Sequence, residues 1–191
     1  MKTPVRTLCF AALTFLAACT AVGERTKVSV GYYNVNGETF DELDQDIRLH
    51  GPNVTGVGKA LASTDLRMVP KIKYARQRHG CKVSSARVNV NARVTLPRHT
   101  NEAGLRSELA SAWQNLEEYA KIHEAVHLAI ADRYALIMEE AILDLPGQNT
   151  CDVMRQQAKQ TFSVLFQHHH EEQLAFDASE KQRIKQLIAL R

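Results

Sequence analysis

The sequence predicts an α+β fold, in which a small antiparallel sheet in the N-terminal half packs against long C-terminal helices. Apolar residues alternate with polar ones in two segments between residues 66 and 96, and from residue 102 onward they recur at steps of three and four. The chain is 45% hydrophobic and 24% charged, as is typical of soluble globular proteins. Its 191 residues are enough for one domain of ordinary size.

The first structured segments are expected to be a strand and a short helix. "KVSVGYYNVNG", residues 27–37, is rich in β-branched and aromatic residues and ends at the turn-forming pair Asn36-Gly37. "ETFDELDQDIRLHGP", residues 38–52, has apolar residues at helical spacing, acidic residues early and Gly51-Pro52 as its end.

The two alternating segments indicate a β-hairpin with one dry and one wet face. His79-Gly80 provides the turn between them. Pro70 has no N–H to donate to a neighbouring strand, so we expect its strand to lie at a sheet edge. The apolar positions are Leu66, Met68, Pro70, Ile72 and Tyr74, then Val88, Val90, Ala92, Val94 and Leu96.

Two long helices are predicted for the C-terminal half. The first has an apolar stripe from Leu105 to Ala141 that includes His123 and His127, and Pro146-Gly147 ends it. The second runs from about Cys151 to Leu190, with His169, Glu172 and Phe176 among its inward positions.

The N-terminus has the features of an export signal. Residues 1–18 combine a basic start with an apolar run too short to span a bilayer, and Leu16-Ala17-Ala18-Cys19 looks like a bacterial lipobox. We therefore expect a signal peptide at 1–18, a lipidated Cys19, a tether at 19–26 and a single domain at 27–191. An ordinary signal peptide with a chance cysteine is the alternative. Thr20, in place of Asp after the cysteine, favours a lipoprotein that is anchored in the outer membrane and faces the periplasm.

The charge balance argues against nucleic acid as a partner. The whole chain carries a formal net charge of +3. Cleavage after residue 18 removes Lys2 and Arg6 from 24 basic residues and leaves 21 acidic ones, so the mature charge is +1. No basic run interleaved with aromatic residues suggests single-strand binding.

Two cysteines are left for pairing once Cys9 is cleaved off and Cys19 carries lipid. In an oxidising compartment we expect Cys81 and Cys151 to form a disulfide. Two buried free thiols are the alternative.

The segment "KIHEAVHLAI", residues 121–130, contains His-Glu-x-x-His. On a helix, His123 and His127 lie one turn apart, so one ring nitrogen of each can bind the same ion. Glu124 lies on the flank of the same face, where a carboxylate can deprotonate water without binding the metal. Two hydrogen-bonded core histidines are the alternative, but burying two imidazoles without partners costs a few kcal/mol. We therefore expect a Zn²⁺ site with Glu124 as the catalytic residue.

Several segments resemble one bacterial family over most of the mature chain. They are "YYNVNGETFDEL", "LHGP", "GCKVSSARVNVNARVTLP", Trp113 and "HEAVH". The family consists of uncharacterised exported proteins described as predicted secreted zinc-dependent proteases. The resemblance implies a peptidase and no defined substrate. The chain departs from the family pattern at Val126, where glycine is common, at Arg98-His99, where tryptophan is usual, and at residues 176–183, where a Tyr-Asp-x-x-Thr-x-His-Gly pattern is replaced.

The third protein ligand is left open by the sequence. A catalytic zinc is bound by three protein ligands and one water, and Arg133 stands where the extended histidine motif requires its third histidine. Asp177, which remains from the family's terminal pattern, Glu180 nearby and His169 are the candidates. Successive residues on a helix point about 100° apart, so at most one of residues 168–170 can join a buried site.

Two functions remain as hypotheses. The first is a lipid-anchored zinc metallopeptidase of the cell envelope that acts on a peptide or protein substrate, which the edge near Pro70 could align by strand addition. The second is a non-catalytic envelope lipoprotein that retains the fold and a structural metal. Metal capture through His168–His170 is a weaker third hypothesis, because the tract is short and lies within a helix.

Overall fold

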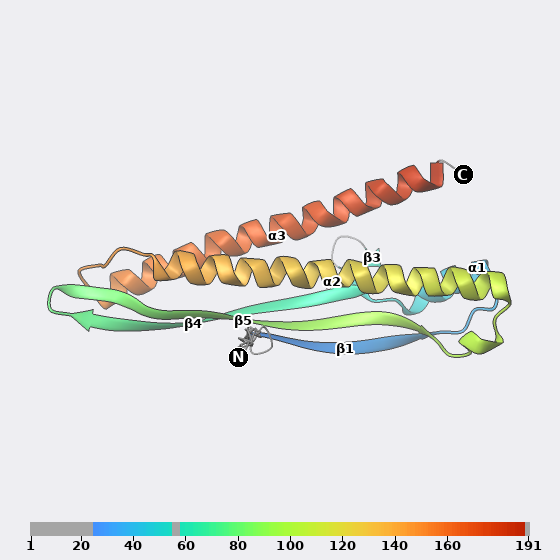
Figure 1. The fold of residues 1–191 in the computed structure, drawn as a ribbon, viewed down its shortest axis with the longest axis horizontal. Coiled ribbons are helices and arrows are strands. Elements are labelled where there is room, and N and C mark those ends of the chain that lie inside the picture. The colour runs from blue at the N-terminus through green and yellow to red at the C-terminus, as the bar shows by residue number, and fades with distance from the viewer. Residues whose placement is uncertain (1–24, 55–57, 190–191) are drawn as a thin grey trace, which may run out of the picture.

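The computed structural model, which describes residues 25–54 and 58–189, confirms the α+β prediction. A sheet from the N-terminal half lies along one side of two long helices (Figure 1). The signal peptide and Cys19 lie outside the described residues. The elements are β1 Thr26–Val35, α1 Phe40–His50, β2 Asn53–Val54, β3 Gly58–Lys59, β4 Ser63–Gln77, β5 Gly80–His99, the 3-10 turn Glu102–Gly104, α2 Ser107–Leu143 and α3 Cys151–Ala189.

The main sheet is mixed and not antiparallel throughout. Its strand order is β1-β5-β4, and β4 and β5 form the expected antiparallel hairpin. Strand β1 pairs with β5 in parallel, from Thr26 opposite Val90 to Val35 opposite His99. Because α1 and β4 separate β1 from β5 in the sequence, the chain has room to return and to place the two strands in the same direction.

Pro70 lies on an edge strand, as the sequence predicts. It is opposite Val88 in the central strand β5. The Val90 N–H donates to the Arg25 carbonyl, so the Val88 N–H, two residues earlier, points to the same side of β5. There β1 has not yet begun, and the Glu139 carboxylate of α2 accepts that N–H at 2.7 Å. The nitrogen of Pro70 therefore points to the outer edge, where no ladder donor is required.

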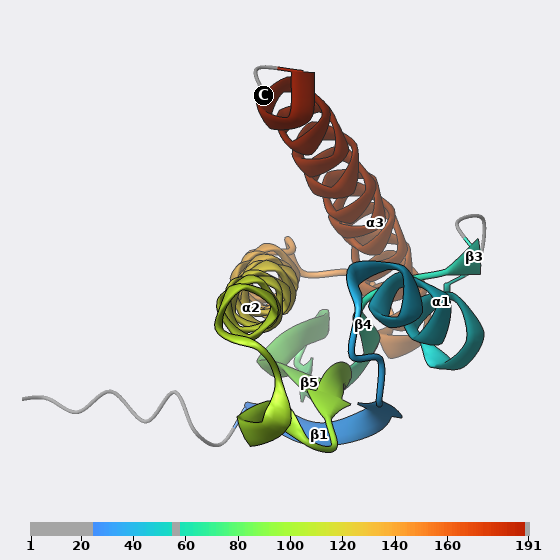
Figure 2. The same ribbon diagram turned by 90° about the vertical axis from the view of Figure 1, so that its right-hand side faces the viewer.

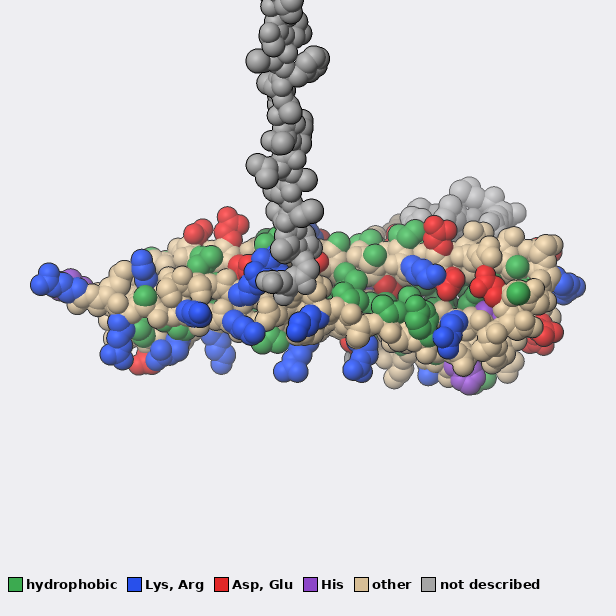
Figure 3. All heavy atoms as spheres, turned by 60° about the horizontal axis from the view of Figure 1, so that its bottom comes forward, with side chains coloured by type: hydrophobic (Ala, Val, Ile, Leu, Met, Phe, Trp, Pro, Cys, Tyr) green, Lys and Arg blue, Asp and Glu red, His purple; other side chains and the backbone are tan. Residues whose placement is uncertain are grey.

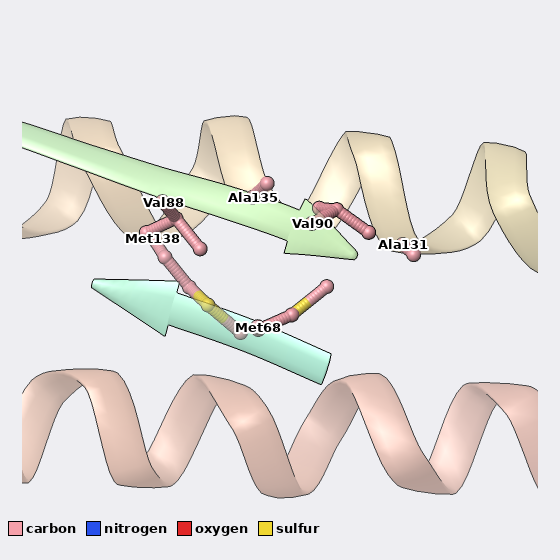
Figure 4. Close-up of a cluster of buried hydrophobic side chains, with 6 residues drawn as sticks. All are labelled: Met68, Val88, Val90, Ala131, Ala135 and Met138. Carbon is pink, nitrogen blue, oxygen red and sulfur yellow. The ribbon is translucent and has the colours of Figure 1, made fainter. Parts of the chain in front are cut away.

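Helix α2 covers the sheet through a row of small and large apolar residues. Ala131, Ala135 and Met138 pack on Met68, Val88 and Val90, all at most 8% exposed (Figure 4). The small alanines let the helix approach the strands closely, and the methionines fill the remaining space. The buried positions along α2 recur mostly at steps of three, four and seven; they are Leu109, Trp113, Ala120, Glu124, Ile130, Ala131, Ala135, Met138 and Ile142.

Helix α3 returns antiparallel to α2 on the same side of the sheet (Figures 1 and 2). Its first turn is tied to β5 by a disulfide between Cys81 and Cys151, the two cysteines that the sequence leaves for pairing. The bond lies in a cluster of buried apolar side chains that includes Val83, Ile142 and Met154. Figure 1 shows α3 rising away from α2 toward the C-terminus. None of the helices in the described part of the chain has an apolar stretch of the length that a bilayer span requires.

We predict that loss of the disulfide lowers the thermal stability. The bond closes a loop with a sequence separation of 70. The chain-entropy model then gives a loss of about 4 kcal/mol for Cys81→Ala/Cys151→Ala, or roughly 10 °C in melting temperature for a domain of this size. Circular dichroism melts would measure it. Reduced wild-type protein, which lacks only the bond, is the control and should melt near the double variant. Equal melting of oxidised and reduced wild type would contradict the prediction.

Candidate metal centre

Three side chains on α2 and α3 bring ligand atoms together. The Nε2 atoms of His123 and His127 lie 3.2 Å apart, and Asp177 Oδ1 lies 3.2 Å from the first and 3.1 Å from the second. In the described part of the chain, no further His, Cys, Asp or Glu adds a ligand atom to this group. The structure thus places the two predicted histidines together and brings Asp177 to them, but neither Glu180 nor His169.

The helical arrangement explains why these atoms meet. His123 and His127 are one turn apart on α2, and the antiparallel α3 passes over them at Asp177. The two imidazoles are mostly buried, with 18% and 12% of their side-chain surface exposed, while Asp177 is 46% exposed. The group therefore lies at the rim of the helix pair, where it has access to solvent.

The donor set and its spacing suit a zinc ion. Ligands that bind zinc at about 2.0–2.1 Å in a tetrahedron lie roughly 3.3 Å from one another, close to the 3.1–3.2 Å observed. His127 Nδ1 donates to Gln173 Oε1 at 2.5 Å, which leaves its Nε2 lone pair directed at the other two acceptors. A proton can bridge only one edge of this triangle well, whereas a cation at its centre serves all three atoms.

His123 has its polar contacts at one ring nitrogen. Its Nδ1 atom is buried and has no hydrogen-bond partner among the described residues. The ring packs against Phe176, with centroids 4.8 Å apart, so its polar contacts are at Nε2. A half-buried imidazole held in this way is stabilised when Nε2 has a strong partner.

The other two candidate ligands have different roles. Glu180 Oε2 accepts a hydrogen bond from the Tyr119 hydroxyl at 3.3 Å. His169 is 5% exposed, and its Nε2 accepts from the Gln173 amide at 2.9 Å, so it supports the residue that orients His127. Burial lowers the pKa of His169, which favours the neutral ring that this hydrogen bond requires.

The expectation that Glu172 faces inward is wrong. Its side chain is 37% exposed and pairs with Arg133, whose hydrogen bond lowers the pKa of the Glu172 carboxyl. Arg133, which excludes the extended histidine motif, thus has a partner on α3 outside the metal group.

Glu124 is more buried than the sequence predicts. It is 4% exposed, whereas the histidines, expected on the inward stripe, lie beside it toward α3. The reason is that the sheet, and not α3, covers the most buried face of α2. Glu124 Oε2 accepts a hydrogen bond from Thr64 Oγ1 on β4 at 2.6 Å. Burial raises the pKa of the Glu124 carboxyl, while the Thr64 hydroxyl and the charges of His127 and His123 act in the opposite direction.

The sequence did not predict that Gln173 contacts His127 or that Thr64 contacts Glu124. Gln173 lies between His169 and Asp177 at steps of four, so the helical period could have placed it on the same face, but a glutamine carries no metal signature of its own. Thr64 is 60 residues from Glu124 in the sequence, and no local pattern connects them.

The comparisons with known proteins identify a family. Residues 30–183 match the model of a bacterial protein family of unknown function, DUF922. The search of curated proteins and the search of solved structures gave no match. The matched range includes every described strand and helix in full or in part. The description of the family names no activity, which agrees with the expected uncharacterised bacterial family. Because the match extends over well more than half of the sequence, the chain belongs to this bacterial family of unknown function.

Proposed function

We propose that the protein is a zinc-dependent metallopeptidase of the cell envelope, anchored through a lipid on Cys19. The observation that carries the proposal is the triangle of His123, His127 and Asp177, with Glu124 beside it on the same helix. Two histidines and one carboxylate are a donor set of catalytic zinc sites, which keep a fourth position for water or substrate.

The three ligands would hold the ion at the solvent-exposed rim of the helix pair. Bound there, zinc would supply the Lewis acidity that polarises a scissile carbonyl and acidifies water. Gln173 keeps the His127 ring in the orientation and tautomer that ligation requires.

Glu124 would move the proton. The charges of both histidines and of Asp177 act on its carboxylate, so the carboxylate lies close to the ligand group without being part of it. As general base it would accept a proton from the attacking water, and as general acid it would pass that proton to the leaving amine. Thr64 positions the carboxylate from the opposite side.

The proposed substrate is an extended peptide or protein segment. Strand β4, which carries Thr64, is an edge strand of the main sheet. Its outer side could pair with an extended chain by strand addition and so bring a peptide bond past Glu124.

A structural role of the metal is the second candidate. An ion bound here would join α2 to α3 beyond their apolar contacts, since two ligands come from one helix and one from the other. This second function requires a fourth protein ligand to close the site, and the described residues supply three. The catalytic proposal therefore fits the ligand count better.

We predict that Asp177→Asn weakens zinc binding. The loss of a charged ligand should reduce affinity by more than the roughly 10–100-fold that loss of a supporting contact costs. Competition titration against a chelating dye at fixed pH would measure it. Asp152→Asn, an exposed aspartate on the same helix and outside the ligand group, is the matched control and should bind like wild type. Wild-type affinity in Asp177→Asn would exclude Asp177 as a ligand.

We predict that Glu124→Gln abolishes hydrolysis and retains the metal. The amide has the shape of the carboxylate and can still accept from Thr64, but it cannot accept a proton from water. Cleavage of a fluorescently labelled unfolded protein should fall by roughly 10²–10⁴-fold, the usual contribution of general acid–base catalysis. Zinc affinity should stay within a few-fold, because Glu124 is not a ligand. Equal activity of the variant and the wild type would rule out this role.

We predict that Thr64→Val lowers kcat while KM and zinc affinity change little. The valine has a similar shape but cannot donate to Glu124, so the carboxylate loses its fixed orientation. Thr64→Ser keeps the hydroxyl and should restore most of the activity. A Thr64→Ser variant as slow as Thr64→Val would show that packing, and not the hydrogen bond, matters at this position.

A further inference from the structure

The basic residues of the protein are concentrated in the sheet, although the chain as a whole is close to neutral. Strands β1, β4 and β5 contain nine Lys and Arg residues and one acidic residue, Asp65. Helices α2 and α3 contain twelve acidic and seven basic residues. The molecule therefore has a basic side and a more acidic side, although its net charge is small.

The register places most of these basic side chains on the sheet face that points away from α2. Lys71 lies opposite Arg87, and Arg67 and Asn91 are paired with each other. Their neighbours along the strands, Met68, Val88 and Val90, are the residues that pack on α2, so the basic residues must point the other way. Figure 3 shows Lys and Arg side chains in a row along this side of the molecule. The basic face consists of Lys27, Arg67, Lys71, Lys73, Arg87 and Arg93.

An apolar strip lies at the edge of the sheet on the side of α2, since its residues pair with Ala92, Val94 and Leu96, which alternate with the basic residues. Val28, Val30 and Tyr32 alternate along the edge strand β1 and are 47%, 51% and 51% exposed. Hydrophobic side chains gather beside the basic row in Figure 3. A shallow hollow between Ser29, Arg67 and Arg93 opens on the basic face. A row of cations on one face of a sheet attracts anionic lipid headgroups, each Lys or Arg near the surface contributing about 1 kcal/mol.

We propose that this face lies on an anionic lipid surface. The position of the chain's anchor favours lipid over other polyanions. The covalent chain from Cys19 to Arg25 spans at most roughly 20 Å, and Thr26 and Lys27 enter the sheet beside Val90 and Asn91, near the middle of β5. A lipid on Cys19 would therefore keep the basic face next to the bilayer. This argument rests on the lipidation in the proposed function and is independent of the peptidase activity.

The orientation has a consequence for the metal centre. The helices α2 and α3 cover the opposite side of the sheet from the basic face (Figure 2). The sheet would therefore lie against the lipid, and His123, His127 and Asp177 would lie on the side directed away from it. Substrates would then come from the surrounding compartment and not from the membrane.

Vesicle sedimentation tests the proposal on a chain that carries neither the covalent lipid nor a metal. The mature chain, residues 19–191 with Cys19→Ser, retains every described element and cannot be acylated. We expect it to bind vesicles that contain phosphatidylglycerol, to lose binding as salt is raised, and to leave pure phosphatidylcholine vesicles unbound. Arg67→Glu/Lys71→Glu/Arg93→Glu should weaken binding by roughly 100-fold. Val28→Ser/Val30→Ser, which changes the face on the side of α2, should bind like the parent chain.

The matched control reverses the charge of three basic residues on the helices. Arg48→Glu/Arg155→Glu/Lys159→Glu changes the net charge by the same amount, and its positions lie on α1 and α3. Binding that stays within a few-fold of the parent chain would support the proposal. Equal loss in both triple variants would show that only net charge matters and would overturn it. Binding to short duplex DNA but not to the anionic vesicles would also overturn it and would identify a nucleic acid partner. Melting temperatures would confirm that each variant is folded.

Discussion

Helix α2 packs against the sheet with one face and against α3 with the adjacent face, and the site depends on both contacts. The sheet-facing stripe buries Ala131, Ala135 and Met138 and also takes in Glu124. The next face directs His123 and His127 at α3, where Asp177 meets them. Because the motif residues His123, Glu124 and His127 face two different neighbours, β4 holds the Glu124 carboxylate and α3 holds the two imidazoles.

Gln173 and Thr64 hold the side chains on the two faces of α2 in place. Gln173 bonds to both the ring and the backbone carbonyl of His127 and also to His169, so three polar groups between α2 and α3 are satisfied by one amide. On the other side, the Thr64 hydroxyl supports a carboxylate whose pKa is raised by burial. The disulfide holds the start of α3 on the sheet, far along the helix from Asp177, so that α3 is tied at Cys151 and meets α2 again at Asp177.

Periodicity predicted the parts of the structure that depend on one segment at a time. The hairpin, the edge position of Pro70 and both long helices follow from alternation and from three- and four-residue steps. The parallel pairing of β1 could not be predicted, because it depends on where the chain returns after α1. The apolar pattern put the inward face of α2 on His123 and His127, because the sheet and α3 both contact apolar residues of this helix. Only the packing shows which face the sheet covers. Asp177, Glu180 and His169 all had suitable chemistry, and only the crossing of the two helices shows that Asp177 is the one brought to the histidines. The separation of basic residues on the sheet from acidic residues on the helices likewise could not be predicted from the net charge.

A crystal structure of the zinc-loaded protein, with anomalous scattering recorded at the zinc edge, would test the metal centre itself. We expect one anomalous peak at about 2.0–2.1 Å from Nε2 of His123, Nε2 of His127 and Oδ1 of Asp177, with a fourth position filled by water. A peak elsewhere, or no peak between these three atoms, would contradict the metal centre, and a protein side chain in the fourth position would contradict the catalytic proposal.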